Sequence, residues 1–354
     1  MVSLLLKGDF LTVKKQITLD RFRIFSALLI IAIHTYPLDT INPTLDFIFT
    51  HIFCRIGVPF FLMISGYFIL PQALKDKKVL VHYTIKIIKL YLFCILLYLP
   101  IHLYAGSFVN SNILTVIKDI LINGTFYHLW YFPALIMGIW ITFGMIKYFK
   151  KPYILLLLFY ILGLLGDSYY GITEKWIFTK NIYDVIFHIF DYSRNGLFYV
   201  PLFLYLGYVI KQIKWKMSQR TSLWLFCTSL FLMILEGLLL HHFHLQRHDS
   251  MYIMLIPTMV FLFYFIQKDN KENHPFLRNI ATSIYIFHPI FIIFVRGISK
   301  LTHLESLFIE NSCMHYLLVA ITTVSFSVIL ENIKKKVGKN NEKRLKKKPS
   351  LDRN

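Results

Sequence analysis

An arginine and a histidine that could act together in chemistry stand eleven residues apart in LDRFRIFSALLIIAIHTYP, residues 19–37. An α-helix turns about 100° and rises about 1.5 Å per residue, so Arg23 and His34 would project from one face, roughly 16 Å apart. A guanidinium binds anions, and an imidazole exchanges protons near neutral pH. The plain alternatives are that Arg23 reaches lipid headgroups and that His34 is a hydrogen-bonded packing residue.

Further ionisable side chains occur in other apolar segments. Arg55 opens RIGVPFFLMISGYF, where it needs a carboxylate, a phosphate or water as a partner. Glu236 lies in a later apolar run, where it is expected to pair with an arginine or to orient a histidine. His128 and Trp130 begin the apolar run in YHLWYF, and His288 is midway along SIYIFHPIFII. Such a set suits an enzyme that works within the bilayer or a proton-linked transporter.

The composition places these side chains in a membrane protein. Of the 354 residues, 56% are hydrophobic and only 16% are charged, and 33 are Phe. A soluble domain of this length could not bury so much apolar surface. The formal net charge of +19 therefore raises the question of where the Lys and Arg residues lie relative to a membrane.

Ten apolar segments predict the transmembrane topology. They cover residues 17–38, 47–70, 84–105, 127–146, 152–170, 196–213, 221–242, 251–267, 279–297 and 313–333. With the N-terminus inside, thirty of the 38 Lys and Arg residues fall on the cytoplasmic side and seven on the outer side. The positive-inside rule then predicts an all-α integral membrane protein with about ten transmembrane helices and both termini cytoplasmic.

The chain is predicted to form one membrane domain. We expect it to span residues 17–333, after a cytoplasmic N-terminal segment (1–16) and before a cytoplasmic basic tail (334–354). The tail reads as a solvated basic run that can lie on anionic lipid.

Two outer connections have patterns of their own. Residues 111–122 have the spacing of an amphipathic helix on the outer interface. Residues 171–195 are predicted to be the longest outer loop. An external acceptor would be met in such a loop, which holds Asp191 and Arg194.

Several other classes of function are disfavoured. The chain has no Gly-x-Ser-x-Gly, phosphate-loop or dinucleotide-binding motif. The four Cys are spread singly, and a cluster of four histidines near Asp249 lacks further acidic ligand spacing, so we expect no metal. Because the basic residues follow the membrane topology, we expect a lipid bilayer and not nucleic acid as a partner.

The ordered motifs resemble membrane acyltransferase family 3 over nearly the whole chain. The resemblance is carried by Arg23 and His34 with ten residues between them, then VPFFLMISGYF, HLWYF and SIYIFHP. LWYFPALIMGIW, GDSYYG and QRHDSMYIMLIP most resemble the membrane domain of vancomycin-resistance-type membrane serine racemases. Ile24 replaces the glycine that many members carry after the arginine, as in that branch. Few residues follow the last span, so we expect the racemase domain to be absent.

The resemblance implies an O-acyltransferase of the cell membrane that transfers groups other than amino-acyl groups. The donor would be cytoplasmic acyl-CoA, with acetyl-CoA as the expected co-substrate and no bound cofactor, and the acceptor a hydroxyl of a cell-envelope carbohydrate or similar compound. In this interpretation Arg23, Arg55 and Ser65 bind the donor, and His34 and Glu236 are catalytic. The acceptor side would be formed by His128, Trp130, Asp191, Arg194 and His288.

The alternative hypothesis is transport. In the racemase branch the resemblance implies a membrane component that supplies or takes up serine, with an arginine on the carboxylate and a histidine or glutamate coupling protons. A separate soluble racemase would then be a partner. A structural or partner-binding subunit is a third possibility, but it leaves the ionisable groups within the spans without a purpose.

Overall fold

A computed structural model describes residues 17–106, 112–213, 216–267 and 274–347. Within these ranges all regular secondary structure is helical, in agreement with the predicted all-α class. The chain divides into two compact units. Unit 1 comprises residues 1–43 and 269–354, and unit 2 comprises residues 44–268. The predicted N-terminal segment 1–16 and the last seven residues of the tail lie outside the described residues.

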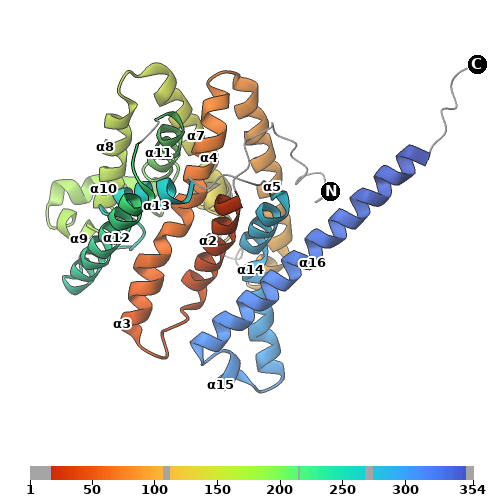
Figure 1. Cartoon of the computed structure of the whole chain (residues 1–354). Coiled ribbons are helices and arrows are strands. Elements are labelled where there is room, and N and C mark those ends of the chain that lie inside the picture. Colours follow the sequence, from red (N-terminus) through yellow and green to blue (C-terminus); the bar gives the residue numbers. More distant parts are fainter. Residues whose placement is uncertain (1–16, 107–111, 214–215, 268–273, 348–354) are drawn as a thin grey trace, which may run out of the picture. The chain divides into compact units, whose positions relative to one another are not determined.

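Unit 1 is formed by the two ends of the chain. Its helices are α2 (Ile17–Thr35), α14 (Pro275–Leu301), α15 (Glu305–Phe308) and α16 (Ser312–Lys347). The three long helices α2, α14 and α16 each pack against the other two, although α2 lies far from the others in sequence (Figure 1). Small hydroxyl residues such as Ser26, Ser283 and Thr323 are buried, and they permit close helix approach. The Thr323 hydroxyl donates to the Val319 carbonyl at 2.6 Å, so its burial costs no hydrogen bond.

Unit 2 contains the remaining helices, with α3 (Pro43–Asp46) at its start. They are the π-helix η1 (Phe47–Ile52), the 3₁₀ helix η2 (Phe53–Ile56), α4 (Gly57–Ala73), α5 (Lys77–Tyr104), α6 (Ile113–Lys118), the π-helix η3 (Asp119–Asn123), α7 (Tyr131–Tyr148), α8 (Pro152–Leu165), α9 (Tyr170–Thr173), α10 (Ile177–Ile189), α11 (Val200–Gln212), α12 (Gln219–His242) and α13 (Leu255–Gln267). Several begin at side-chain caps, which satisfy backbone N–H groups that have no helical partner. Asp76, Asn112 and Ser218 cap α5, α6 and α12 in this way.

The closest helix pair in unit 2 is α4 with α11, and glycines make the approach possible. A Cβ atom on Gly66 would lie 1.9 Å from the Leu204 carbonyl oxygen, and one on Gly207 would lie 2.0 Å from that of Met63. No side chain fits at either position without moving backbone. The two glycines therefore fix how closely α4, which directly follows η2 with Arg55, packs against α11.

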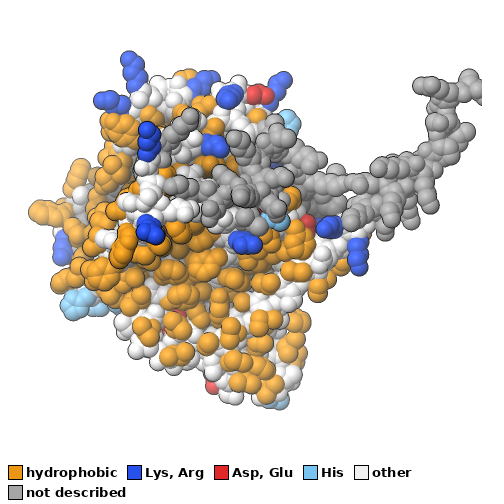
Figure 2. Space-filling view, in the orientation of Figure 1, with side chains coloured by type: hydrophobic (Ala, Val, Ile, Leu, Met, Phe, Trp, Pro, Cys, Tyr) orange, Lys and Arg blue, Asp and Glu red, His pale blue; other side chains and the backbone are white. Residues whose placement is uncertain are grey.

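The helices have the length and surface of an integral membrane protein. Six described helical segments are long and apolar enough to cross a membrane: 43–73, 77–104, 131–148, 219–242, 275–301 and 312–337. Hydrophobic side chains cover much of the face shown in Figure 2, and Lys and Arg side chains lie across its upper half. Every one of the ten predicted spans has a helix. However, α8, α11 and α13 have only 13 or 14 residues, and α2 carries three charges, so the count of ten stays a prediction.

Two connections singled out in the sequence contain helices. The amphipathic helix expected at 111–122 is present as α6 and η3, with Ile113, Leu114 and Leu121 exposed. The connection predicted over 171–195 contains two helices, α9 and α10. The exposed apolar side chains of α10, which include Ile177, Phe178 and Val185, recur at helical spacing.

The basic tail begins as part of a helix. Helix α16 does not end near residue 333 but continues to Lys347. The Lys334 ammonium lies 3.6 Å from Glu331, within the same helix. The first part of the tail is therefore a helical extension of the last span.

Candidate functional site

Helix α2 presents the predicted arginine and histidine as expected. It is one continuous helix that contains both Arg23 and His34, and both side chains are partly exposed. Arg23 donates from Nη1 to Asp20 Oδ1 at 2.5 Å, and Arg278 Nε lies 4.0 Å from the same oxygen. Two guanidiniums thus lie beside one carboxylate. Arg278, on α14, was not singled out from the sequence.

His34 faces a second imidazole from α14. The rings of His34 and His288 are stacked, with centroids 5.4 Å apart and planes 16° from parallel. His288 is fully buried. Its Nδ1 lies 2.9 Å from the Tyr285 carbonyl and 3.2 Å from that of Ile284, so Nδ1 carries the proton, because a carbonyl only accepts.

The sequence explains why this carbonyl is available. Pro289 has no N–H, so it cannot donate to the carbonyl four residues earlier, which is that of Tyr285. The His288 ring takes the place of that donor and is thereby fixed in orientation. His288, predicted on the acceptor side, and His34, predicted to be catalytic, thus belong to one site in unit 1.

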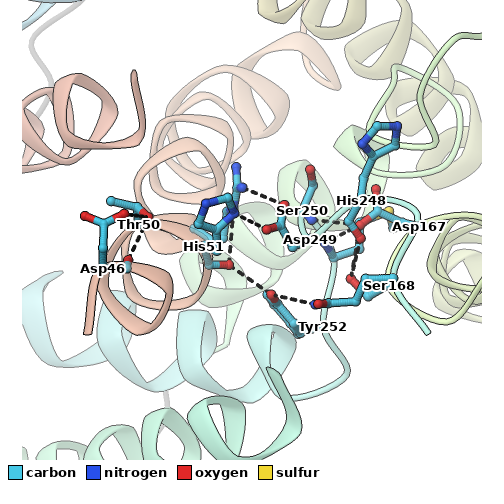
Figure 3. Close-up of polar contacts among 12 residues, drawn as sticks. Asp46, Thr50, His51, Asp167, Ser168, His248, Asp249, Ser250 and Tyr252 are labelled. Carbon is cyan, nitrogen blue, oxygen red and sulfur yellow. Dashed lines mark hydrogen bonds and ion pairs between the residues drawn. The ribbon is translucent and has the colours of Figure 1, made fainter. Parts of the chain in front are cut away.

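A second polar cluster lies in unit 2, around the carboxylate of Asp249 (Figure 3). Arg55 Nη2 donates to Asp249 Oδ1 at 2.8 Å, and His51 Nδ1 bonds the other oxygen, Oδ2. Burial opposes ionisation of Asp249, but the Arg55 guanidinium and the hydrogen bond from His51 hold its pKa well below the usual range. The carboxylate that Arg55 needed is therefore supplied by the protein.

His51 and Asp249 were missed as site residues. They lie on η1 and on the segment that joins α12 to α13, about two hundred residues apart, and no local pattern connects them. His51 lies on the π-helix η1, and such segments often occur at functional sites. This signal appears only in the structure, because the sequence does not reveal a π-helix.

Arg194 and Trp130, both predicted on the acceptor side, are brought together in unit 2. The Arg194 guanidinium lies over the rings of Trp130 and Tyr192, with its carbon 5.2 Å and 4.7 Å from the ring centroids. Its Nη1 donates to Ser250 Oγ at 3.3 Å. Burial and the nearby Arg55 guanidinium lower the pKa of Arg194. Ser250 follows Asp249 directly, so Arg194 belongs to the same cluster.

The other acceptor-side residues make contacts that stabilise the fold. Asp191 accepts from Lys118 Nζ and from Asn123 Nδ2, each at 2.7 Å, and so ties α6 and η3 to the end of α10. His128 is buried against the rings of Tyr98 and Phe126.

Glu236 and Ser65 also have partners within unit 2. Glu236 accepts from the Tyr169 hydroxyl at 2.8 Å and from the Ile253 and Met254 backbone N–H groups at 2.6 and 2.9 Å. These partners differ from the expected arginine or histidine, and they anchor the segment before α13. The Ser65 hydroxyl donates to the Phe61 carbonyl and accepts from Tyr83.

These features define a polytopic helical membrane protein with ionisable side chains at and between its helices. A family model described as an acyltransferase domain, the acyltransferase family 3 domain, matches residues 16–332. The chain belongs to this family.

The curated relatives are larger proteins with names that refer to racemases. Two proteins from Enterococcus faecalis named amino-acid racemase are 38% and 35% identical, over 88% and 92% of this chain. A serine/alanine racemase from Enterococcus gallinarum is 33% identical over 87% of this chain. The matches cover 44%, 47% and 45% of these relatives, so the chain spans less than half of their length. No solved structure matches.

Proposed function

We propose that the protein is an integral membrane O-acyltransferase. It would transfer an acyl group, with acetyl as the first candidate, from cytoplasmic acyl-CoA to a hydroxyl of a cell-envelope acceptor. The observation that carries the proposal is that Arg23 and His34 share one face of α2 in a chain of the acyltransferase family.

The donor end of the proposal rests on charge. Arg23 and Arg278 both lie beside the Asp20 carboxylate, and guanidiniums are suited to the phosphates of coenzyme A. Arg55 and Ser65 remain proposed donor residues, although the donor would have to compete with the contacts that they make within unit 2, to Asp249 and Tyr83.

His34 would act as the general base. The acceptor oxygen attacks the thioester carbonyl carbon while its proton passes to the His34 imidazole, so that a C–O bond forms and the C–S bond breaks. The proton then returns to the leaving thiolate. The stacked His288 ring limits the orientations that His34 can adopt. Of the other proposed residues, Glu236 supports catalysis through the segment that it anchors, while His128, Trp130, Asp191 and Arg194 form the acceptor side.

The proposal includes an orientation. With ten spans and both termini in the cytoplasm of a cell membrane, the connections that hold Asp249 and Arg194 lie on the outer side, and Asp167 lies near the outer end of the span 152–170. A thiol reagent that cannot cross the membrane should then label a cysteine introduced at Trp176 but not one introduced at Asp76. The reverse pattern would invert the topology.

A second candidate function is supported by the names of the relatives. Because one relative is named serine/alanine racemase and the match covers less than half of its length, the matched part could supply serine to a separate soluble racemase. Arg23 would then bind the serine carboxylate, and His34 would couple proton movement.

One experiment separates the two candidates. Purified protein is titrated with coenzyme A to millimolar concentration while its thermal stability is measured. The acyltransferase proposal expects a rise in melting temperature that is smaller in Arg23→Lys, since lysine lacks the planar fork, and unchanged in Arg21→Lys, the exposed neighbour on α2.

The His34→Ala variant completes the test. It should still be stabilised by coenzyme A but should lose acyl transfer, with the loss falling on kcat and not on KM. Absence of any stabilisation of the wild type, together with uptake of labelled serine into proteoliposomes, would favour the second candidate.

A further inference from the structure

Three buried polar atoms without a hydrogen-bond partner belong to two neighbouring segments of unit 2, and two of their residues, Asp167 and Arg194, interact electrostatically. The three atoms are Asp167 Oδ2, Ser193 Oγ and Arg194 Nε. Asp167 is in the turn after α8, and the other two precede α11. The segments touch, because a Cβ atom on Gly166 would lie 2.6 Å from Ser193 Oγ. Buried polar groups in folded proteins are almost always bonded, so three unmet groups in one place indicate a missing ligand or water.

The Arg194 side chain is held in place by aromatic rings but donates few hydrogen bonds. The aromatic rings of Trp130 and Tyr192 fix the guanidinium, which has five N–H donors. Its one hydrogen bond within the described part of the chain is the long contact to Ser250. Arg194 is only partly buried, so a ligand can reach it. A positioned guanidinium with spare donors favours a planar anion such as a carboxylate.

Asp167 determines which chemical group must stand beside the carboxylate of the ligand. Its Oδ1 accepts from the backbone N–H groups of Ser250 and Met251 at 2.7 and 3.0 Å, while Oδ2 has no partner. The side chain is fully buried. A bare anion would be repelled by this carboxyl group, whereas an O–H or N–H hydrogen on the ligand would satisfy Oδ2.

We propose that Arg194 and Asp167 form a binding site for a carboxylate that has a hydroxyl or ammonium group beside it. Arg194 binds the carboxylate, Asp167 Oδ2 accepts from the neighbouring donor, and Ser193 Oγ completes the contacts. A sugar acid and an α-amino acid both have this chemistry. That the ligand is the acyl acceptor rests on the proposed function, but the binding site itself does not.

The test uses pairs of probes that differ only in the carboxylate. Thermal stability of the purified protein is measured with glucuronate against glucose, with L-serine against serinamide, and with acetate as a bare anion. The site predicts stabilisation by glucuronate or L-serine and none by the partner that lacks the carboxylate or by acetate. Which of the two acids binds identifies the source of the carboxylate. Stabilisation by neither, or equally by acetate, would overturn the proposal.

Substitutions locate the effect. Arg194→Gln should weaken binding of the active probe roughly 10- to 100-fold, the loss expected for a charged hydrogen bond, and Arg194→Lys should recover part of it. Asp167→Asn keeps the acceptor for Ser250 and should weaken binding without unfolding the protein. Arg247→Gln is the matched control, because Arg247 also lies over an aromatic ring, that of Phe187 at 3.4 Å.

Two results distinguish this proposal from the enzymatic one. Equal weakening in Arg247→Gln and Arg194→Gln would show a general charge effect and would refute the site. Binding that is lost only in the Arg194 and Asp167 variants, in a protein that neither binds coenzyme A nor transfers acyl groups, would support the carboxylate site and refute the proposed function.

Discussion

The ion pair of Arg55 and Asp249 should be among the strongest single polar contacts in unit 2. The Arg55 side chain is 10% exposed and that of Asp249 is 20% exposed, and their atoms are 2.8 Å apart. Asp249→Asn keeps the shape of the side chain but leaves the Arg55 guanidinium without its counter-charge. Removing one partner of a buried pair costs about 3–5 kcal/mol, because the remaining charge stays desolvated. We expect a loss near the lower end, since Asp249 retains some contact with solvent.

A double-mutant cycle measures this coupling. Arg55→Met removes the cation. The double variant Arg55→Met/Asp249→Asn should therefore lose less free energy of unfolding than the sum of the losses in the two single variants, with a coupling energy of roughly 2 kcal/mol. Unfolding of the four proteins is followed by denaturant titration in detergent.

The exposed pair of Lys118 and Asp191 provides the control. Its separation is 2.7 Å, almost the same, but its side chains are 28% and 46% exposed. Asp191→Asn should therefore cost less than about 1 kcal/mol. Equal losses in Asp191→Asn and Asp249→Asn, or strict additivity in the cycle, would refute the argument that burial determines the strength of the Arg55 pair.

Two further predictions concern packing and pH. Gly66→Ala should destabilise the protein by about 3 kcal/mol, because its Cβ would meet the Leu204 carbonyl. Gly144→Ala, whose Cβ would have nothing within 4 Å, should be neutral or stabilising. Equal melting temperatures of the two variants would refute the close helix contact. Burial, with the nearby Arg194 guanidinium, lowers the pKa of His248 to about 4, so the folded protein binds this proton more weakly than the unfolded chain. Stability should then be fully present above pH 6.5 and fall as the pH drops toward 4, and His248→Gln should flatten this slope in melting curves recorded across that range.

Much of the local structure and the family could be predicted from the sequence. The one-face arrangement of Arg23 and His34 follows from the helical repeat, which backbone hydrogen bonds determine within a few residues. The apolar runs likewise predicted helices, since a segment of that composition must satisfy its backbone internally in a membrane. The connection predicted at 171–195 contains α10, whose apolar repeat at helical spacing is a local signal of the same kind.

The partners of the site residues could not be predicted in the same way. Helical periodicity states which face a side chain occupies, but not which other helix covers that face. Arg55 meets Asp249 across 194 residues of chain, and the contact depends on how η1, η2 and α12 pack. The sequence by itself determined the class of protein, the helices and the stripe of Arg23 and His34. Only the tertiary structure decided that His288 stacks on His34 and that Arg194 lies between aromatic rings, because packing and not local spacing selects such contacts.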